Sequence, residues 1–290
     1  MKAAPLRVGL VGLDSSHALW FARLLNDVAH PAHVAGARAE AAWAGGVEEL
    51  PLSRDRVEGF SRQVRDECGV ELLDSPEAVA ERCDLVIVTA VDGRTHAALA
   101  RRLFAAGKPL FVDKPLTTDL AEARALLDEA EARGVPLWSA SALRFLARGG
   151  DAANTGARRL LLRAPLPFEP AMPGWWWYGL HAVETAIAVL GPEWREIAWR
   201  REGEEEVATM RFADGAEAEL RGTRGTYDGG FRLSMDGGAE RDLLAGERPF
   251  YAPLLEQIVR FGASGQAPVS KREMLATLAA VAEINSRRRG

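Results

Sequence analysis

The chain has 290 residues, 48% hydrophobic and 27% charged, a composition typical of globular protein and a length sufficient for two domains. Its formal net charge of −5 provides no basic field for polyanions, which argues against nucleic acid as a partner. No apolar stretch approaches the ~20 residues of a membrane span, so we expect no membrane association. The first predicted strand leaves no separate cleavable segment before it, and we expect a cytoplasmic protein. The two cysteines, Cys68 and Cys83, have neither disulfide-framework nor metal-site spacing, so we expect core thiols and no metal.

Short apolar runs alternate with amphipathic stretches through the first half of the chain. The predicted strands are 6–12, 37–44, 70–73, 84–90, 109–113 and 135–140. The predicted helices are 16–27, 54–67, 76–82, 94–106 and 118–133. This alternation is typical of parallel βαβ units and predicts a doubly wound α/β domain over residues 1–143.

The pattern changes after a predicted boundary in 144–157. Period-two alternation broken by Asp-Gly and Gly-Gly turns predicts a mostly antiparallel open sheet in an α+β domain, residues 144–290. Its predicted strands are 158–166, 196–202, 206–215, 216–223 and 231–238. Its predicted helices are 181–191, 252–262 and 271–289.

The first strand leads into an altered nucleotide-binding turn, RVGLVGLDSSH. A dinucleotide fold places glycines here because the pyrophosphate contacts backbone N–H groups at a helix N-terminus. Only Gly12 is in place, with Asp14 and His17 at the second and third glycine positions. We expect Asp14 to cap the helix that follows, and its carboxylate to leave any pyrophosphate displaced or weakly held.

Residues 83–137 carry a second signal. His96 heads a predicted helix, and Asp113-Lys114-Pro115 follows a predicted strand. Together with GLHAVETAIAVLG and the closing APVSKREMLATLAAVAEINS, these motifs resemble the Gfo/Idh/MocA oxidoreductases, the glucose-fructose oxidoreductase and inositol dehydrogenase family. The resemblance spans nearly the whole chain.

This resemblance implies a Rossmann domain that binds NAD or NADP, a second domain built on a large open sheet, and hydride transfer to or from a small sugar-like polyol. It also suggests a homo-oligomer, a dimer formed through the second sheet. The residues expected to bind the cofactor are Gly12, Leu13, Asp14, Ser15, Ser16, His17, Thr89, Val91, Asp113 and Lys114.

Two departures from the family pattern bear on the expected activity. Trp177 stands where the family commonly has a catalytic Asp, four residues before the His. The ribose-binding acid after the second strand is also missing, so a preference for NAD is unsupported. NADP would require an arginine of Ser53-Arg54-Asp55-Arg56 to reach the 2′-phosphate, but we interpret this segment as a Ser-capped helix start.

Oxidation of a secondary alcohol requires a base for the hydroxyl proton and a cation beside the developing alkoxide. His181 and Lys114 are the right types, and we expect a cleft between the domains to bring them together. Glu184, one helical turn after His181, is expected to orient or charge the imidazole. The alternatives are a core histidine and a surface lysine.

For the substrate, we expect contacts from Trp177 and Tyr178, whose rings can pack against a sugar face, and from Arg144 as a substrate-facing cation. Packing in the core or at an interface is the alternative for the aromatic pair. The sequence thus predicts an NAD(P)-dependent dehydrogenase acting on CH–OH groups. A degenerate relative that binds a sugar-like ligand or a partner without turnover, and a redox-neutral enzyme that uses its nucleotide transiently, remain alternatives.

Overall fold

A computed structural model of the chain describes residues 4–147, 156–246 and 249–289. These residues form two compact units. The first unit contains Met1–Thr117, Ala121–Ser139 and Tyr251–Val269, and the second contains Thr118–Leu120, Ala140–Phe250 and Ser270–Gly290. The boundary predicted in 144–157 stays a prediction, because residues 148–155 of that stretch lie outside the described residues.

A six-stranded sheet forms the centre of the first unit. Its strands are β1 (Leu6–Val11), β2 (Ala37–Trp43), β3 (Glu71–Leu72), β4 (Leu85–Val88), β5 (Leu110–Asp113) and β6 (Leu137–Ala140). They lie in the order β3-β2-β1-β4-β5-β6, and the paired strands run parallel. This order confirms the doubly wound Rossmann topology, whose reversal point between β1 and β4 is where such sheets bind ligands.

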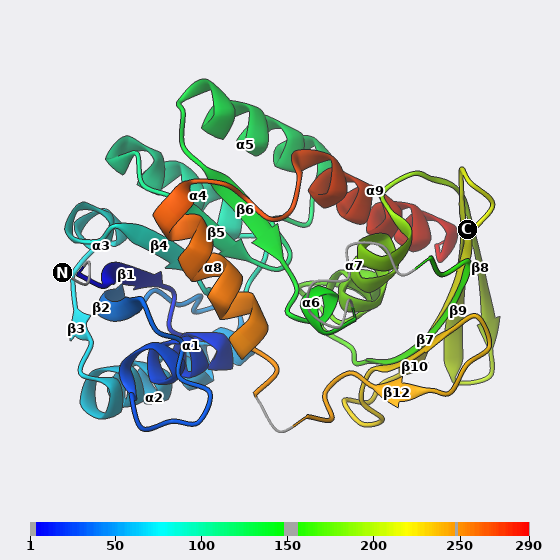
Figure 1. The fold of residues 1–290 in the computed structure, drawn as a ribbon, viewed down its shortest axis with the longest axis horizontal. Helices are drawn as coiled ribbons and strands as arrows, with labels where there is room; N and C mark the ends of the chain where they lie inside the picture. Colours follow the sequence, from blue (N-terminus) through cyan, green and yellow to red (C-terminus); the bar gives the residue numbers. More distant parts are fainter. Residues whose placement is uncertain (1–3, 148–155, 247–248, 290) are drawn as a thin grey trace. The chain divides into compact units, whose positions relative to one another are not determined.

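Helices cover both faces of this sheet, which is why β4, β5 and β6 are buried along their whole length. They are α1 (Ser16–Asn26), α2 (Pro51–Cys68), α3 (Pro76–Arg82), α4 (His96–Leu103), α5 (Leu120–Ala132) and α8 (Ala252–Ser264), with the 3-10 turn η1 (Phe104–Ala106). Figure 1 shows α1 and α2 on one side of the strands and α4 and α5 on the other. Both cysteines are buried free thiols, as expected, and burial raises the pKa of Cys83 to about 11.

The position of α8 corrects the sequence-based division, which assigns this helix to the second domain. The ring of Phe261 packs edge-on against Trp138 of β6, with 5.9 Å between centroids. A Cβ on Gly262 would lie 2.9 Å from the Leu85 side chain in β4, so α8 packs closely against the first sheet. Along the sequence, the chain therefore returns to the first unit after it has contributed most of the residues of the second unit.

The second unit contains a mixed sheet. Its strands are β7 (Arg159–Leu166), β8 (Trp194–Glu202), β9 (Glu205–Phe212), β10 (Glu217–Arg224), β11 (Arg232–Met235) and β12 (Arg241–Asp242). The order is β12-β11-β7-β10-β9-β8, and every pair is antiparallel except β7 with β10. This confirms the mostly antiparallel open sheet. The helices are α6 (Leu143–Ala147), α7 (Gly179–Leu190) and α9 (Lys271–Arg287), with the 3-10 turn η2 (Gly174–Trp176).

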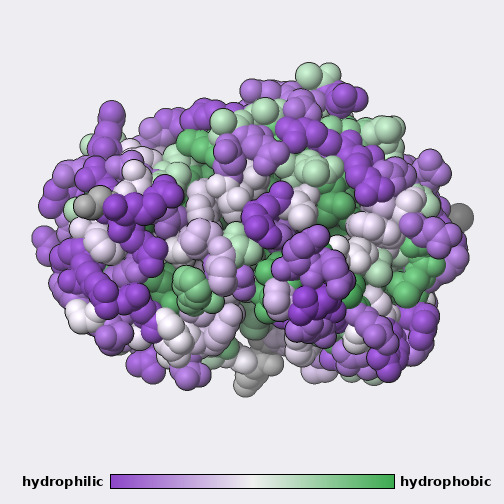
Figure 2. All heavy atoms as spheres, turned by 180° about the vertical axis from the view of Figure 1, so that it is seen from behind, coloured by the Kyte–Doolittle hydropathy of each residue, from purple (hydrophilic) through white to green (hydrophobic). Residues whose placement is uncertain are grey.

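The two faces of this sheet differ in chemistry. Helices α7 and α9 pack on one face, where β10 buries Ala218 and Leu220. The other face carries interlocking ion pairs among Arg163, Arg200, Arg211, Arg221, Glu196, Glu202, Glu205, Glu217, Glu219 and Glu240. Figure 2 shows that hydrophilic residues cover most of the visible surface of the molecule. Within the described part of the chain, no helix is long and apolar enough to cross a membrane.

Candidate functional site

The turn between β1 and α1 requires a glycine at its first position. Gly12 has a φ of +90°, and a Cβ there would lie 2.7 Å from backbone atoms of Ala90, after β4. The N–H of Gly12 donates to the carbonyl of Trp43 and that of the buried Leu13 to the carbonyl of Ala44, both after or at the end of β2. The turn therefore lies directly against the carboxyl ends of both neighbouring strands.

Asp14 does not cap α1, so that expectation is wrong. Its fully buried carboxylate accepts a hydrogen bond from the Val91 N–H at 2.8 Å and another from the Ser53 hydroxyl at 2.6 Å. Ser53 in turn accepts from the Val47 N–H at 2.7 Å and lies inside α2, whose N-cap is Leu50. Asp14 therefore joins the segments that follow β1, β2 and β4, and Ser53 is its partner and not a helix cap.

The N-terminus of α1 fits an anionic group. Its N-cap, Ser15, makes no capping hydrogen bond, and its first turn contains no acidic residue. The Ser15 hydroxyl donates instead to the carbonyl of Thr89 at 2.6 Å. Because the first N–H groups of a helix have no intrahelical partner and the helix dipole favours negative charge, this end suits a pyrophosphate.

His17, at the third-glycine position, faces a buried carboxylate. Its Nδ1 lies 2.6 Å from Oδ2 of Asp113, at the end of β5, and its ring packs edge-on against Tyr251, with 4.7 Å between centroids. Burial by itself would raise the pKa of Asp113, but the positive charges of His17 and Lys114 outweigh burial and lower that pKa to about 2. Asp113 thus stays ionised and holds an imidazole at the start of α1.

Two further polar residues fix the same edge of the sheet. The buried ring of His96 lies between the carbonyl oxygens of Pro115, 2.6 Å from Nδ1, and Ala90, 2.7 Å from Nε2. The Thr89 hydroxyl donates to the Gly12 carbonyl at 2.5 Å. The Thr89 hydroxyl is thus used in a hydrogen bond within the protein. Lys114, which directly follows β5, is buried beside the same edge of the sheet.

Arg54 and Arg56, which follow β2, are the two arginines that could bind a 2′-phosphate. In the structure, both contact residues of their own segment. Arg54 donates to the carbonyl of Glu48 at 3.2 Å and to the Asp55 carboxylate at 3.0 Å. Arg56 donates to the carbonyl of Leu52 at 2.6 Å. These contacts favour neither nucleotide over the other.

In the second unit, Ser141 positions His181. The serine hydroxyl lies 2.6 Å from Nδ1 of His181 and accepts from the Leu143 N–H at 3.1 Å. Ser141 directly follows β6, and His181 lies in the first turn of α7. The imidazole is thus held by a hydroxyl group that the sequence did not indicate, and the expected action of Glu184 on the imidazole stays a prediction.

Glu184 and Arg144 belong to a buried ionic network. Glu184 accepts from the Ser141 N–H at 2.8 Å and from Arg144 at 3.2 Å, and Arg144 also donates to Glu273 at 2.6 Å. Arg144 is 1% exposed, so the expectation of a substrate-facing cation is wrong. Burial raises the pKa of Glu184 to about 7, against the opposing charge of Arg144. Glu184 and His181 thus both contact Ser141.

Aromatic rings surround the partly exposed His181. Tyr178 and Phe231 lie edge-on to the imidazole, at centroid distances of 5.7 and 5.5 Å. Tyr178 also packs edge-on against Tyr227, which is 56% exposed. Trp177 is only 7% exposed, and its Nε1 donates to the Tyr227 hydroxyl at 3.4 Å. The structure thus favours packing for Trp177 and leaves Tyr178 beside the imidazole.

The structure therefore brings the predicted residues together in two groups. Gly12, Asp14, His17 and Asp113 meet at the carboxyl edge of the first sheet, whereas His181 and Glu184 meet around Ser141. Lys114 belongs to the first unit and His181 to the second, so their meeting stays a prediction. Across the three described ranges, no group of three or more His, Cys, Asp or Glu side chains is placed to hold a metal ion.

The sequence pattern assigns no role to Ser141, and it suggests a helix cap at Ser53 and not a partner of Asp14. Ser141 had a signal, because it directly follows a predicted strand at the edge where parallel sheets bind ligands. Ser53 had none, since its partner Asp14 is 39 residues away in the chain.

Comparison with known proteins agrees with this architecture. The family model GFO_IDH_MocA, described as an oxidoreductase family with an NAD-binding Rossmann fold, matches residues 7–141. A myo-inositol dehydrogenase from Streptomyces leeuwenhoekii is 48% identical over 63 residues, 21% of this chain and 19% of that protein. An inositol 2-dehydrogenase from Cereibacter sphaeroides is 30% identical over 177 residues, 58% of this chain and 47% of that protein. The matches thus span less than half the length of either curated relative.

A solved structure extends the likeness to both units. The UDP-N-acetylglucosamine 3-dehydrogenase from Acidithiobacillus ferrooxidans superposes with a TM-score of 0.75 over 98% of each chain, at 18% identity. At that identity the likeness shows the fold alone.

Proposed function

We propose that the chain, whose residues 7–141 match the model of the Gfo/Idh/MocA oxidoreductase family, is an NAD(P)-dependent dehydrogenase acting on a CH–OH group of a small, sugar-like polyol. The observation that carries the proposal is the orientation of His181. A partly exposed imidazole is held through Nδ1 by Ser141 and flanked by the rings of Tyr178 and Phe231. An oriented imidazole beside aromatic rings suits a polyol hydroxyl and the apolar face of its ring.

The first unit supplies the cofactor site in this proposal. The backbone of residues 14–17 at the start of α1 would hold the pyrophosphate of NAD or NADP, and Gly12 lets the preceding turn pack against Ala90. The nicotinamide, when bound, accepts hydride from the substrate carbon or returns it. Asp113 keeps its negative charge, and its carboxylate lies against His17 Nδ1 at the start of α1.

In the second unit, His181 acts as the base. In the tautomer that accepts a proton on Nε2, Nδ1 carries the other proton and donates it to the Ser141 hydroxyl. The imidazole then removes the substrate hydroxyl proton as hydride leaves the carbon. Ser141 is held in turn by Glu184, which accepts its N–H, so the network through Arg144 fixes the position of the base.

Lys114 supplies the cation in this proposal. It directly follows β5, at the sheet edge where open α/β folds bind their ligands. An ammonium group there would stabilise the alkoxide that forms as His181 takes the proton.

A turnover assay tests the proposal. The protein is incubated with NAD or NADP and a panel of inositols and sugars, and reduced nicotinamide is measured. We expect His181→Asn to lower kcat by roughly 100- to 10,000-fold, the usual effect of removing a positioned acid–base group, with cofactor affinity unchanged. His33→Asn, which removes an imidazole of the first unit, is the matched control.

Full turnover by His181→Asn would contradict the assigned base. If no polyol is turned over, but a sugar-like ligand raises the melting temperature only when His181 is present, the chain is a binding protein.

The dimer through the second sheet also stays a proposal. The outer face of that sheet is ionic, so a dimer formed there should weaken as salt screens its charges. Sedimentation at low and high salt measures this, and salt-independent association would argue for another interface. A cytoplasmic location remains a prediction as well.

A further inference from the structure

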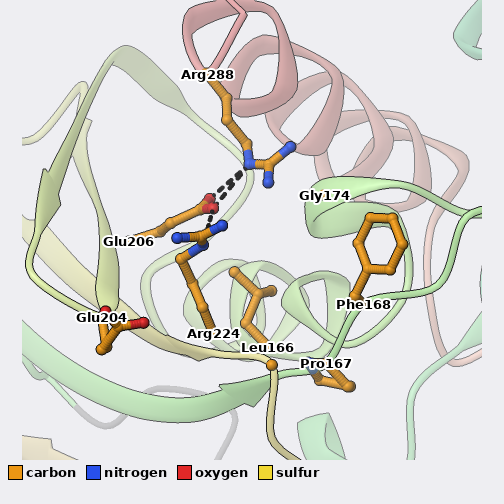
Figure 3. A pocket seen from close by; sticks show the side chains of 9 residues that line it. Leu166, Pro167, Phe168, Gly174, Glu204, Glu206, Arg224 and Arg288 are labelled. Carbon is orange, nitrogen blue, oxygen red and sulfur yellow. Dashed lines mark hydrogen bonds and ion pairs between the residues drawn. The ribbon is translucent and has the colours of Figure 1, made fainter.

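A second pocket lies in the second unit and contains none of the residues assigned to the proposed reaction. It has a volume of about 230 Å³. Its walls are the carboxyl ends of the parallel strands β7 and β10, where Leu166 pairs with Arg224, the turn between β8 and β9, and the end of α9. Figure 3 shows this pocket with Arg224 and Arg288 reaching Glu206 from opposite sides.

Glu206 organises the pocket. It is 2% exposed, and its carboxylate accepts from Arg288 Nε at 2.8 Å and from Trp175 Nε1 at 3.0 Å. Arg224 Nε lies 3.4 Å away. A buried carboxylate requires a paired charge, and one guanidinium would provide it. Two guanidinium groups leave an excess positive charge beside Glu206.

The two guanidinium groups are positioned to bind a ligand. Both face Glu206 through Nε, and their side chains remain 35% exposed for Arg224 and 29% for Arg288. Over the part of the chain that the structure describes, no protein acceptor takes their terminal nitrogens. A guanidinium held at Nε presents its remaining donors in a fixed plane that matches a carboxylate or phosphate group.

The flanks of the pocket define the rest of the ligand. Phe168 is 72% exposed, one of few large apolar side chains so exposed, and it lies on the flank opposite Glu204 in Figure 3. An aromatic ring beside a pair of arginines suits an apolar group attached to the anion. The negative charge of Glu204 on the other flank opposes a highly charged ligand.

From this arrangement we propose that the pocket binds a small organic anion, a single carboxylate or phosphate group joined to an apolar ring. The volume is below the ~300–1,000 Å³ typical of pockets for drug-sized molecules and fits about one ring and one anionic group. The site is separate from His181, and its occupancy does not depend on the polyol chemistry proposed above.

Titrations of the full chain with benzoate, phenyl phosphate, inorganic phosphate and phenol, followed by nuclear magnetic resonance, test this proposal. We expect benzoate or phenyl phosphate to bind more tightly than phenol, and the tighter of the two identifies the anionic group. Arg288→Gln should weaken that anion roughly tenfold or more, since a hydrogen bond to a charged group is lost. Glu204→Gln should tighten it severalfold, because a repelling charge is removed.

Phe168→Ala should weaken the binding of the ring-bearing anion and leave inorganic phosphate unaffected. Phe168 and Glu204 are exposed, so these two variants test the proposal even if Arg288→Gln fails to fold. Binding of phenol as tight as that of both anions, or anion affinities unchanged in Arg288→Gln and Glu204→Gln, would overturn it. His181→Asn should bind the anion like the unaltered protein, and loss of binding there would also overturn a separate site.

Discussion

Replacing Asp14 with glycine restores the usual residue of a dinucleotide turn, yet we expect it to destabilise this protein. The carboxylate is fully buried and accepts from the Val91 N–H and the Ser53 hydroxyl. Without it, two buried donors lose their acceptor, at about 1–3 kcal/mol each. The expected loss in the free energy of unfolding is therefore about 2–6 kcal/mol, toward the lower end if water fills the space.

Urea unfolding of the variant beside the unaltered protein measures this loss. Asp14→Asn keeps one acceptor oxygen and should lose less than Asp14→Gly. Asp74→Gly, a change at an exposed bend of the same unit, is the matched control and should stay within about 0.5 kcal/mol. If Asp14→Gly unfolds with the same free energy as the control, Asp14 does not join the three strand ends in the way described.

Three further predictions follow from the same networks. Ser141→Ala should lower kcat roughly 10- to 100-fold with KM unchanged, and it should shift the apparent pKa of the proposed base. Ser141→Thr keeps the hydroxyl and should retain turnover. Equal pH–kcat profiles for Ser141→Ala and the unaltered protein would exclude a positioning role for Ser141. Burial raises the pKa of Glu184 from 4.5 to about 7, so its contribution to stability is present below pH 4.5 and lost as pH rises to about 7. The unaltered protein should therefore lose stability relative to Glu184→Gln over that range, and a constant difference in melting temperature would refute this. The pKa of Asp113 is lowered from 3.8 to about 2, so its contribution is present above pH 3.8 and lost as pH falls to about 2. Asp113→Asn should be destabilised most at neutral pH, and a deficit that grows in acid would count against the pair with His17.

The fold follows from features that are local in the sequence. Alternating strand and helix patterns predict the Rossmann sheet, and period-two alternation predicts the second sheet, because each element carries its own hydrophobic periodicity. The assignment of α8 to the first unit has no such local signal. It depends on Phe261 meeting Trp138, a contact between segments more than a hundred residues apart.

The side-chain networks were harder to predict for the same reason. An Asp before a helix is typical of an N-cap, but the tertiary fold offers Asp14 a backbone N–H 77 residues away. Likewise, the spacing of His181 and Glu184 predicts a direct contact, whereas the hydrogen bonds of the carboxylate come from Arg144 and the Ser141 N–H. Residue type and spacing pointed to the helix that carries the proposed base, but not to Ser141, which contacts it.

The central claim, that this chain works with a nicotinamide nucleotide, is tested most directly by calorimetric titration of the purified protein with NADH and with NADPH. The arrangement of Gly12, the uncapped start of α1 and the Asp113–His17 pair predicts saturable binding of at least one of them, at one site per chain. Absence of saturable binding for both nucleotides would contradict the account.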